Sequence, residues 1–264
     1  MGRPAPRQMN NMPDEGRDEL PQTIPYHIAE RIRMSIITWR YPPGSNLREV
    51  DLCAEFGSSR GPVREALRLL ELRGLVEHAP RRGFRVSEHN EDGLRHLYLL
   101  RTQLEGTVIE ALAVKDVNEL AEQLERINEA MRDCASHNDI HGYFALNMEF
   151  HQSIIDRTES NILIRVLSIV NDMSLPVRFM LLSTNFPKKS DYTFHKRILQ
   201  AIRHKELKAA RQLTESHIRE NLFQITKMYR QRLAESAIAP TEQIGQPQLQ
   251  PALKGTSKLA RKRT

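Results

Sequence analysis

Apolar residues recur at helical spacing in three segments near the start of the chain. The first segment is Ile24–Trp39, the second is Glu49–Phe56, and the third runs over residues 59–73. The turn 41–45, of sequence YPPGS, separates the first two segments. The spacing predicts these inward-facing positions: Ile28, Ile32, Ile36, Ile37, Val50, Cys53, Phe56, Val63, Leu67 and Leu70. We therefore expect three helices packed around a small apolar core.

The third segment also carries a face of arginine side chains. Arg60, Arg64 and Arg68 lie four residues apart, on a different face from the apolar stripe. Ser59 is a typical N-cap, whose hydroxyl accepts a backbone N–H, and Gly74 supplies the helix stop. Arginines on a helix are usually a solvated face. Here they stand between a helix pair and a basic hairpin, which favours contact with nucleic acid.

The hairpin follows directly after this helix. Leu75–Glu77 and Phe84–Val86 are predicted to pair as short strands, with Arg81, Arg82 and Gly83 at the tip. The order helix, helix, turn, helix and hairpin predicts a winged helix-turn-helix, whose last helix enters the major groove of DNA.

These residues resemble the GntR family of bacterial transcription regulators over about 50 positions. The matching residues are Pro42, Pro43, Gly44, Leu47, Glu49, Leu52, Ser59, Arg60, Pro62, Val63, Arg64, Glu65, Ala66, Leu67, Leu70, Gly74, Leu75 and Val76. The resemblance implies that Arg60 and Arg64 contact phosphates and guanine edges, and that Gly83 lets the wing approach the minor groove. Val50 stands where several members carry a DNA-contacting arginine, so operator preference stays open. The predicted DNA-binding set is Arg48, Ser59, Arg60, Gly61, Arg64, Arg81, Arg82 and Gly83.

The pattern changes to helices only after Ser87, which predicts a mainly α protein with an antiparallel bundle of about six helices. The expected segments are Glu91–Lys115, Val117–Ser136, Asp139–Arg157, Ser160–Ser183, Ser190–His204 and Glu206–Ala237. Pro176 is expected to kink or interrupt the fourth. The predicted organisation is a disordered N-terminus (1–19), a winged helix-turn-helix domain (20–87), a linker (88–92), a helical ligand-binding domain (93–237) and a disordered basic tail (238–264).

Composition supports a cytoplasmic two-domain regulator. The net charge is +6; residues 20–89 hold 11 basic and 8 acidic residues, whereas residues 90–235 hold 20 of each. The surplus in the proposed DNA-binding domain and the tail suits binding to phosphates. Cys53 and Cys134 lie in different predicted domains, so a reducing compartment suffices. We find no secretory signal and no apolar run approaching the ~20 residues that span a bilayer.

Histidines carry the candidate chemistry of the predicted bundle. Asn147 and His151 lie four residues apart on one helix face, His195 lies next to the apolar face of the fifth helix, and His217 lies on the last helix. Three imidazoles from three helices can converge in the bundle core. The other histidines are assigned ordinary structural roles: His27, His78, His89, His96, His137, His141 and His204.

The spacing of these residues resembles the FCD class of ligand-binding domains within the same family. The resemblance covers nearly all of residues 90–235. It implies that Asn147, His151, His195 and His217 hold a divalent metal ion, and that a small carboxylate effector binds beside it. Imidazole-rich sites suit zinc, nickel or other first-row ions. Asn147 replaces an aspartate of many members, so metal affinity is expected to be lower and the site to favour an anion. Arg101 is a candidate effector-binding residue; a surface ion pair with Glu105 is the alternative.

Taken together, the sequence predicts a homodimeric transcriptional regulator that acts as a repressor at operator DNA under the control of a small organic acid. Two alternatives remain open. One is a metal-dependent hydrolase-like enzyme, although Glu149 faces a different side of its helix from Asn147 and His151 and is poorly placed as a general base. The other is a DNA-binding protein that responds to no ligand.

Overall fold

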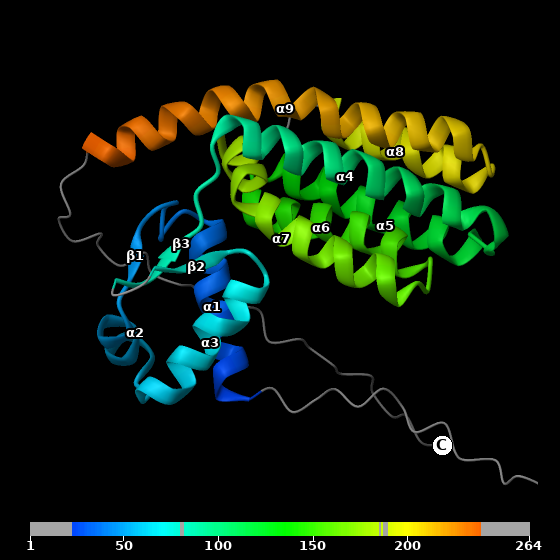
Figure 1. The fold of residues 1–264 in the computed structure, drawn as a ribbon. Helices are drawn as coiled ribbons and strands as arrows, with labels where there is room; N and C mark the ends of the chain where they lie inside the picture. The colour runs from blue at the N-terminus through cyan, green and yellow to red at the C-terminus, as the bar shows by residue number, and fades with distance from the viewer. Residues whose placement is uncertain (1–22, 80–81, 185, 187–189, 239–264) are drawn as a thin grey trace, which may run out of the picture.

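A computed structural model describes residues 23–79, 82–184, 186 and 190–238 (Figure 1). The N-terminal elements are α1 (Ile24–Ile37), β1 (Asn46–Leu47), α2 (Glu49–Phe56), α3 (Arg60–Leu72), β2 (Val76–Ala79) and β3 (Gly83–Val86). The C-terminal elements are α4 (Glu91–Ala111), the 3-10 helix η1 (Leu112–Val114), α5 (Asn118–Ser136), α6 (Ile140–Asp156), α7 (Asn161–Thr184), α8 (Ser190–Arg203) and α9 (Leu207–Ile238). A winged helix-turn-helix followed by a bundle of six α-helices confirms the predicted fold class within this described part.

The N-terminal unit folds around one apolar core. Its central side chains, which include Ile32, Val63 and Leu67, come from α1 and α3, and Phe84 of β3 closes the core from the sheet side. β2 and β3 form the predicted antiparallel hairpin. β1 pairs with the other edge of β3 and was not predicted, because two residues are too few to show an alternating pattern.

Two local predictions for this unit are wrong. Val50 of α2 is 61% exposed, and the buried residue of this helix is Leu52. Two residues along a helix turn the side chain by about 200°, so Leu52 and Val50 cannot share a face. Ser59 stands at the N-cap of α3 in an extended conformation, but its hydroxyl makes no capping hydrogen bond. Since Ser59 is exposed, water can reach the first N–H groups of α3.

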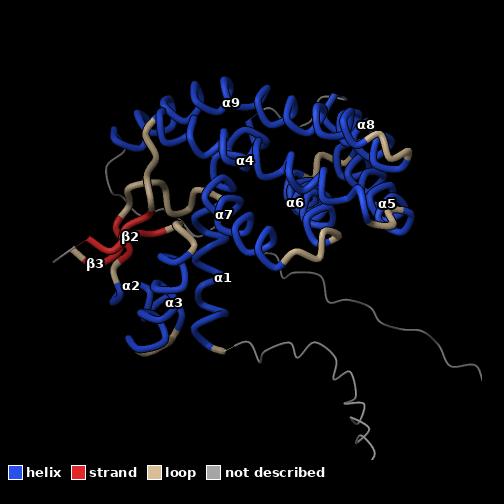
Figure 2. The backbone as a smooth tube through the Cα atoms, turned by 45° about the vertical axis from the view of Figure 1, so that its right-hand side comes forward, coloured by secondary structure: helices blue, strands red, loops and turns tan. Residues whose placement is uncertain are grey.

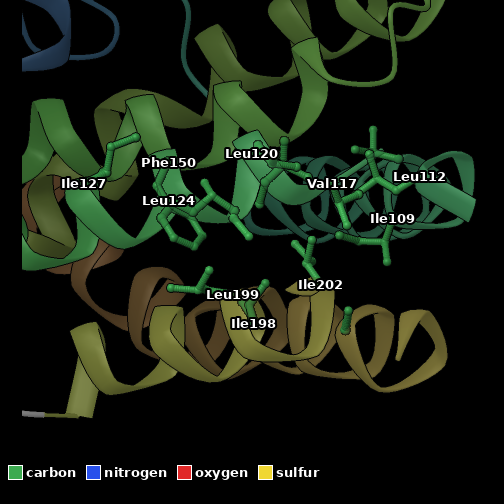
Figure 3. Packing of buried hydrophobic residues seen from close by; sticks show 14 of the residues in the cluster. Ile109, Leu112, Val117, Leu120, Leu124, Ile127, Phe150, Ile198, Leu199 and Ile202 are labelled. Atoms are coloured by element: carbon green, nitrogen blue, oxygen red, sulfur yellow. The ribbon is translucent and has the colours of Figure 1, made fainter. Parts of the chain in front are cut away.

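The bundle is held by a larger core to which α4, α5, α6 and α8 contribute. Figure 3 shows Ile198, Leu199 and Ile202 of α8 facing the apolar side chains of the other helices. All three are at most 1% exposed. This confirms the inward face predicted for α8, which carries His195 on an adjoining position.

Helix α7 differs from expectation in two respects. The helix runs through Pro176 without the interruption that was one of the two expected effects, and the other, a kink, stays a prediction. It is also long and apolar enough, by length and composition alone, to cross a membrane, contrary to the expectation that no segment approaches a span. Half of its most apolar window is buried inside the protein, and Asp172 within it is buried in an ion pair. These are properties of a core helix.

The same helix joins the bundle to the winged helix-turn-helix (Figure 2). Arg33 of α1 donates from Nε and Nη2 to Oδ1 of Asp172, at 2.8 and 2.6 Å. Trp39 donates from Nε1 to the backbone oxygen of Pro176 at 2.9 Å. Tyr229 of α9 adds a hydroxyl that accepts the backbone N–H of His89 at 3.1 Å. The predicted disordered N-terminus (1–19) and Arg81 lie outside the described residues, as does the predicted disordered tail (238–264) except for Ile238, which is the last residue of α9.

Candidate metal centre and nucleic-acid interface

Three histidines from three helices meet inside the bundle. His151 comes from α6, His195 from α8 and His217 from α9. One ring nitrogen of each lies within 4.8 Å of those of the other two. His151 and His195 are 6% and 2% exposed. The ring of Phe150 packs edge-on against the ring of His195, with the two ring centroids 4.8 Å apart. The structure thus brings together the three imidazoles singled out in the sequence.

The spacing of these nitrogens suits a metal ion. The Nε2 atoms of His151 and His195 are 3.4 Å apart. Two nitrogens bound at 2.0–2.1 Å to one tetrahedral ion lie roughly 3.4 Å from each other. Asn147, one helical turn before His151, lines the same cavity, and its buried Oδ1 has no hydrogen-bond partner among the described residues. An orphaned oxygen beside three imidazoles is a donor set that fits a divalent cation.

The protonation state of the histidines also suits ligation. Desolvation by burial lowers the pKa of His151 and of His217 well below the ordinary histidine value. The electrostatic influence of the neighbouring guanidinium of Arg178 acts in the same direction. Both rings are therefore neutral at pH 7, and a neutral imidazole offers a free lone pair to a metal.

Glu105 of α4 lies behind the cluster and was not predicted to belong to it. Its Oε2 is 3.6 Å from Nδ1 of His151, and its Oε1 accepts a hydrogen bond from Nη2 of Arg101 at 2.7 Å. A carboxylate on the outer nitrogen of a histidine favours the orientation in which the other nitrogen faces inward.

The Arg101–Glu105 pair exists, but it is not on the surface. The two residues are 4% and 5% exposed, because α4 packs against α7 and α9 on this side. The expectation of a surface pair is therefore wrong. Arg101 nevertheless lines the histidine cavity.

The cavity has a volume of about 680 Å³ and contains a second arginine that sequence reasoning missed. Arg178 of α7 lines it together with the same histidines. Desolvation and the charge of Arg101 lower the pKa of Arg178 to about 10, so the guanidinium is still charged at pH 7. The sequence does contain a feature that could have identified Arg178, because a charged residue within the apolar run LPVRFMLL is unusual for a core helix.

The arginine face of α3 is exposed, as predicted. Arg60 has no ion pair among the described residues. Arg64 makes a two-pronged pair with Glu49 of α2, with Nε–Oε1 at 2.9 Å and Nη2–Oε2 at 2.8 Å. Arg68 bonds Glu71 at 2.9 Å, and its guanidinium lies over the ring of Phe84. Of the three, Arg60 is thus the one that the folded chain leaves unpaired.

The remaining predicted DNA-binding residues flank this helix. Arg48 is exposed at the N-cap of α2, Gly61 lies in the first turn of α3, and Arg82 is exposed beside the wing tip. Gly83 has a φ of +82°, a conformation that favours glycine, and a side chain there would meet no atom within 4 Å. The glycine therefore has a backbone role in the wing turn, and it leaves the tip open.

Comparisons with known proteins agree with this architecture. Residues 26–86 match the family model described as bacterial regulatory proteins, gntR family, and residues 96–220 match the FCD domain. A gluconate operon transcriptional repressor of Bacillus licheniformis is 32% identical over 174 residues, which cover 65% of this chain and 70% of that protein. The HTH-type transcriptional regulator YdhC of Bacillus subtilis (strain 168) is 28% identical over 206 residues, or 75% of this chain and 90% of the relative.

A solved structure shows the same fold. The crystal structure of a GntR transcriptional regulator from Rhodococcus sp. RHA1 has a TM-score of 0.65 to this chain at 23% identity. The match covers 77% of this chain and 97% of that one. Because the matched families and relatives are transcription regulators, the alternative of a metal-dependent enzyme is set aside. The chain belongs to the GntR family of bacterial transcription regulators and is a DNA-binding protein with an FCD domain.

Proposed function

We propose that this regulator is a cytoplasmic repressor whose affinity for operator DNA is controlled by a small organic acid bound in the bundle cavity beside a divalent metal ion. The observation that carries the proposal is the convergence of three imidazoles, two of them buried, with an amide oxygen that has no hydrogen-bond partner among the described residues and two arginines on one cavity. The relatives named as repressors of the gluconate operon and of a D-xylose utilisation operon support control by a small metabolite.

His151, His195 and His217 are the residues that hold the ion, and Asn147 contributes its Oδ1 as a weaker fourth donor. When bound, a zinc or nickel ion supplies positive charge that a carboxylate binds. Because Asn147 is neutral where an aspartate would be anionic, more of that charge is left for the effector. Arg101 is held in place by Glu105 and presents its guanidinium to the same space.

Helix α7 provides the route from the cavity to the DNA-binding domain. Arg178 lines the cavity, and Asp172, six residues earlier on the same helix, bonds Arg33 of α1. Helix α1 in turn packs against α3, the helix proposed to read DNA. A ligand that shifts α7 therefore acts on the position of α3 through a chain of direct contacts.

The protein is proposed to bind its operator as a homodimer. One winged helix offers a small contact area, so two copies reading a pseudo-palindrome are favoured. The bundle is the expected dimer contact. Ile162, Val166 and Ile169 of α7 are 77%, 41% and 37% exposed and share one helix face, which supports this assignment.

The proposal is tested by measuring operator affinity in the presence of metal and candidate acids. Operator fragments selected from genomic DNA by the full chain are labelled, and binding is followed by fluorescence anisotropy. An effector acid is expected to change the Kd for operator by about 5- to 150-fold in the zinc-loaded protein. The double variant His195→Ala, His217→Ala should keep DNA binding and lose this response. Operator affinity that no acid in the panel alters would establish the alternative of a regulator that responds to no ligand.

A further inference from the structure

Arg178 is a partly buried cation in the cavity wall that has no ion-pair partner among the described residues. Among the described residues it makes no ion pair and no hydrogen bond, although it faces the cavity from the middle of a core helix. Arg101, which lines the same cavity, differs because its Nη2 forms an ion pair with Oε1 of Glu105 at 2.7 Å. A charged side chain removed from water is costly unless an anion accompanies it. The cavity therefore has a place for an anionic group that the chain itself does not fill.

The charges of the cavity indicate how many anionic groups its ligand carries. Asn147 carries no charge, and the ion pair between Arg101 and Glu105 is neutral as a whole. Arg178 leaves one positive charge unmatched on the protein side. A divalent ion at the histidines adds a second positive centre at a different wall. A ligand with two acidic groups can pair with both centres at once, with one group at each.

We propose that the effector is a dianion with two separated acidic groups, of which one binds at the histidine cluster and the other pairs with Arg178. The inference rests on the proposed function and narrows its ligand from small acids in general to the dicarboxylate class. A guanidinium binds a carboxylate through two parallel N–H···O bonds, which selects for a planar anion at this end. The volume of about 680 Å³ accommodates a short dicarboxylate with room to spare.

The test compares acids that differ only in the second carboxylate. Calorimetric titrations of the zinc-loaded full chain are made with succinate, glutarate and adipate, and with butyrate, pentanoate and hexanoate as partners of equal length. At least one dicarboxylate should bind about tenfold or more tightly than its monocarboxylate partner, as expected for a charge-assisted bond. Arg178→Gln should remove this preference.

Two further variants separate the role of Arg178 from general effects. Arg165→Gln, which neutralises an exposed arginine on the same helix, should keep the full preference. Arg178→Lys keeps the positive charge but loses the two parallel N–H donors of the guanidinium, so it should retain part of the preference for dicarboxylates. This variant also provides a test if Arg178→Gln folds poorly. A wild-type protein that binds both acid classes equally, or an Arg178→Gln protein that keeps the preference, would overturn the inference and leave the proposed function standing. Binding of neither class to zinc-loaded protein would overturn both.

Discussion

The ion pair between Asp172 and Arg33 is expected to stabilise the arrangement of the two domains. Asp172 is 6% exposed and accepts two hydrogen bonds from Arg33, while Nε of Arg73 lies 3.8 Å from its other oxygen. Breaking a buried pair by removing one partner costs about 3–5 kcal/mol. The carboxylate of Glu30 lies 3.5 Å from Nη1 of Arg33 and 2.5 Å from Nη1 of Arg73. Because it still pairs with both arginines when Asp172 is replaced, it reduces the cost of the substitution. We therefore expect Asp172→Asn to cost about 2–3 kcal/mol of unfolding free energy.

Urea denaturation of the full chain measures this cost, and Asp156→Asn serves as the control. Asp156 is an exposed acid on α6 whose substitution should stay within about 0.5 kcal/mol of wild type. Because Asp172 joins α7 to α1, its substitution should also weaken the response of operator affinity to the effector, while metal binding is kept. An Asp172→Asn protein with wild-type unfolding free energy and an undiminished effector response would refute the role given to this contact.

Three further predictions concern DNA, metal and pH. Arg60→Ala should cost about 1–3 kcal/mol of specific operator affinity in anisotropy titrations, with an unchanged melting temperature; Arg64→Ala should do the same unless its pair with Glu49 persists on DNA. Asn147→Asp should tighten zinc binding and weaken binding of an acid effector, and calorimetric titration with zinc and then with the acid measures the two affinities separately. If the variant binds both zinc and the acid with wild-type affinity, Asn147 does not belong to the site. In metal-free protein, the lowered pKa values of His151 and His217 mean that the unfolded chain takes up more protons below pH 6.5. The free energy of unfolding should therefore be constant above pH 6.5. At lower pH it should decrease by about 1.4 kcal/mol per pH unit for each of the two histidines. Replacing both histidines by Gln should flatten this pH dependence.

Helical periodicity predicted the order of the elements and placed His151, His195 and His217 beside the apolar faces of three different helices. That the three form one metal site was implied by the resemblance to the FCD class, and the packing of the helices brings the rings together. The wing was predictable for a similar reason, since β2 and β3 are joined by a short turn.

The parts that were missed depend on contacts between distant segments. The spacing of Arg101 and Glu105 is the same for an exposed pair and for a buried one, and only the packing of α4 decides between them. Arg178 belongs to no motif; its role emerges only once α7 forms a wall of the cavity. Likewise, nothing local in the sequence indicates that Asp172 meets Arg33, which lies 139 residues away.

The metal centre on which the proposed regulation depends is tested most directly by crystallography of the zinc-loaded full chain at the zinc absorption edge. An anomalous difference map should show one peak per chain, within about 2.0–2.2 Å of a ring nitrogen of His151, His195 and His217. Zinc found only elsewhere on the protein, with no anomalous peak among these three histidines, would contradict the metal centre and the effector site built on it.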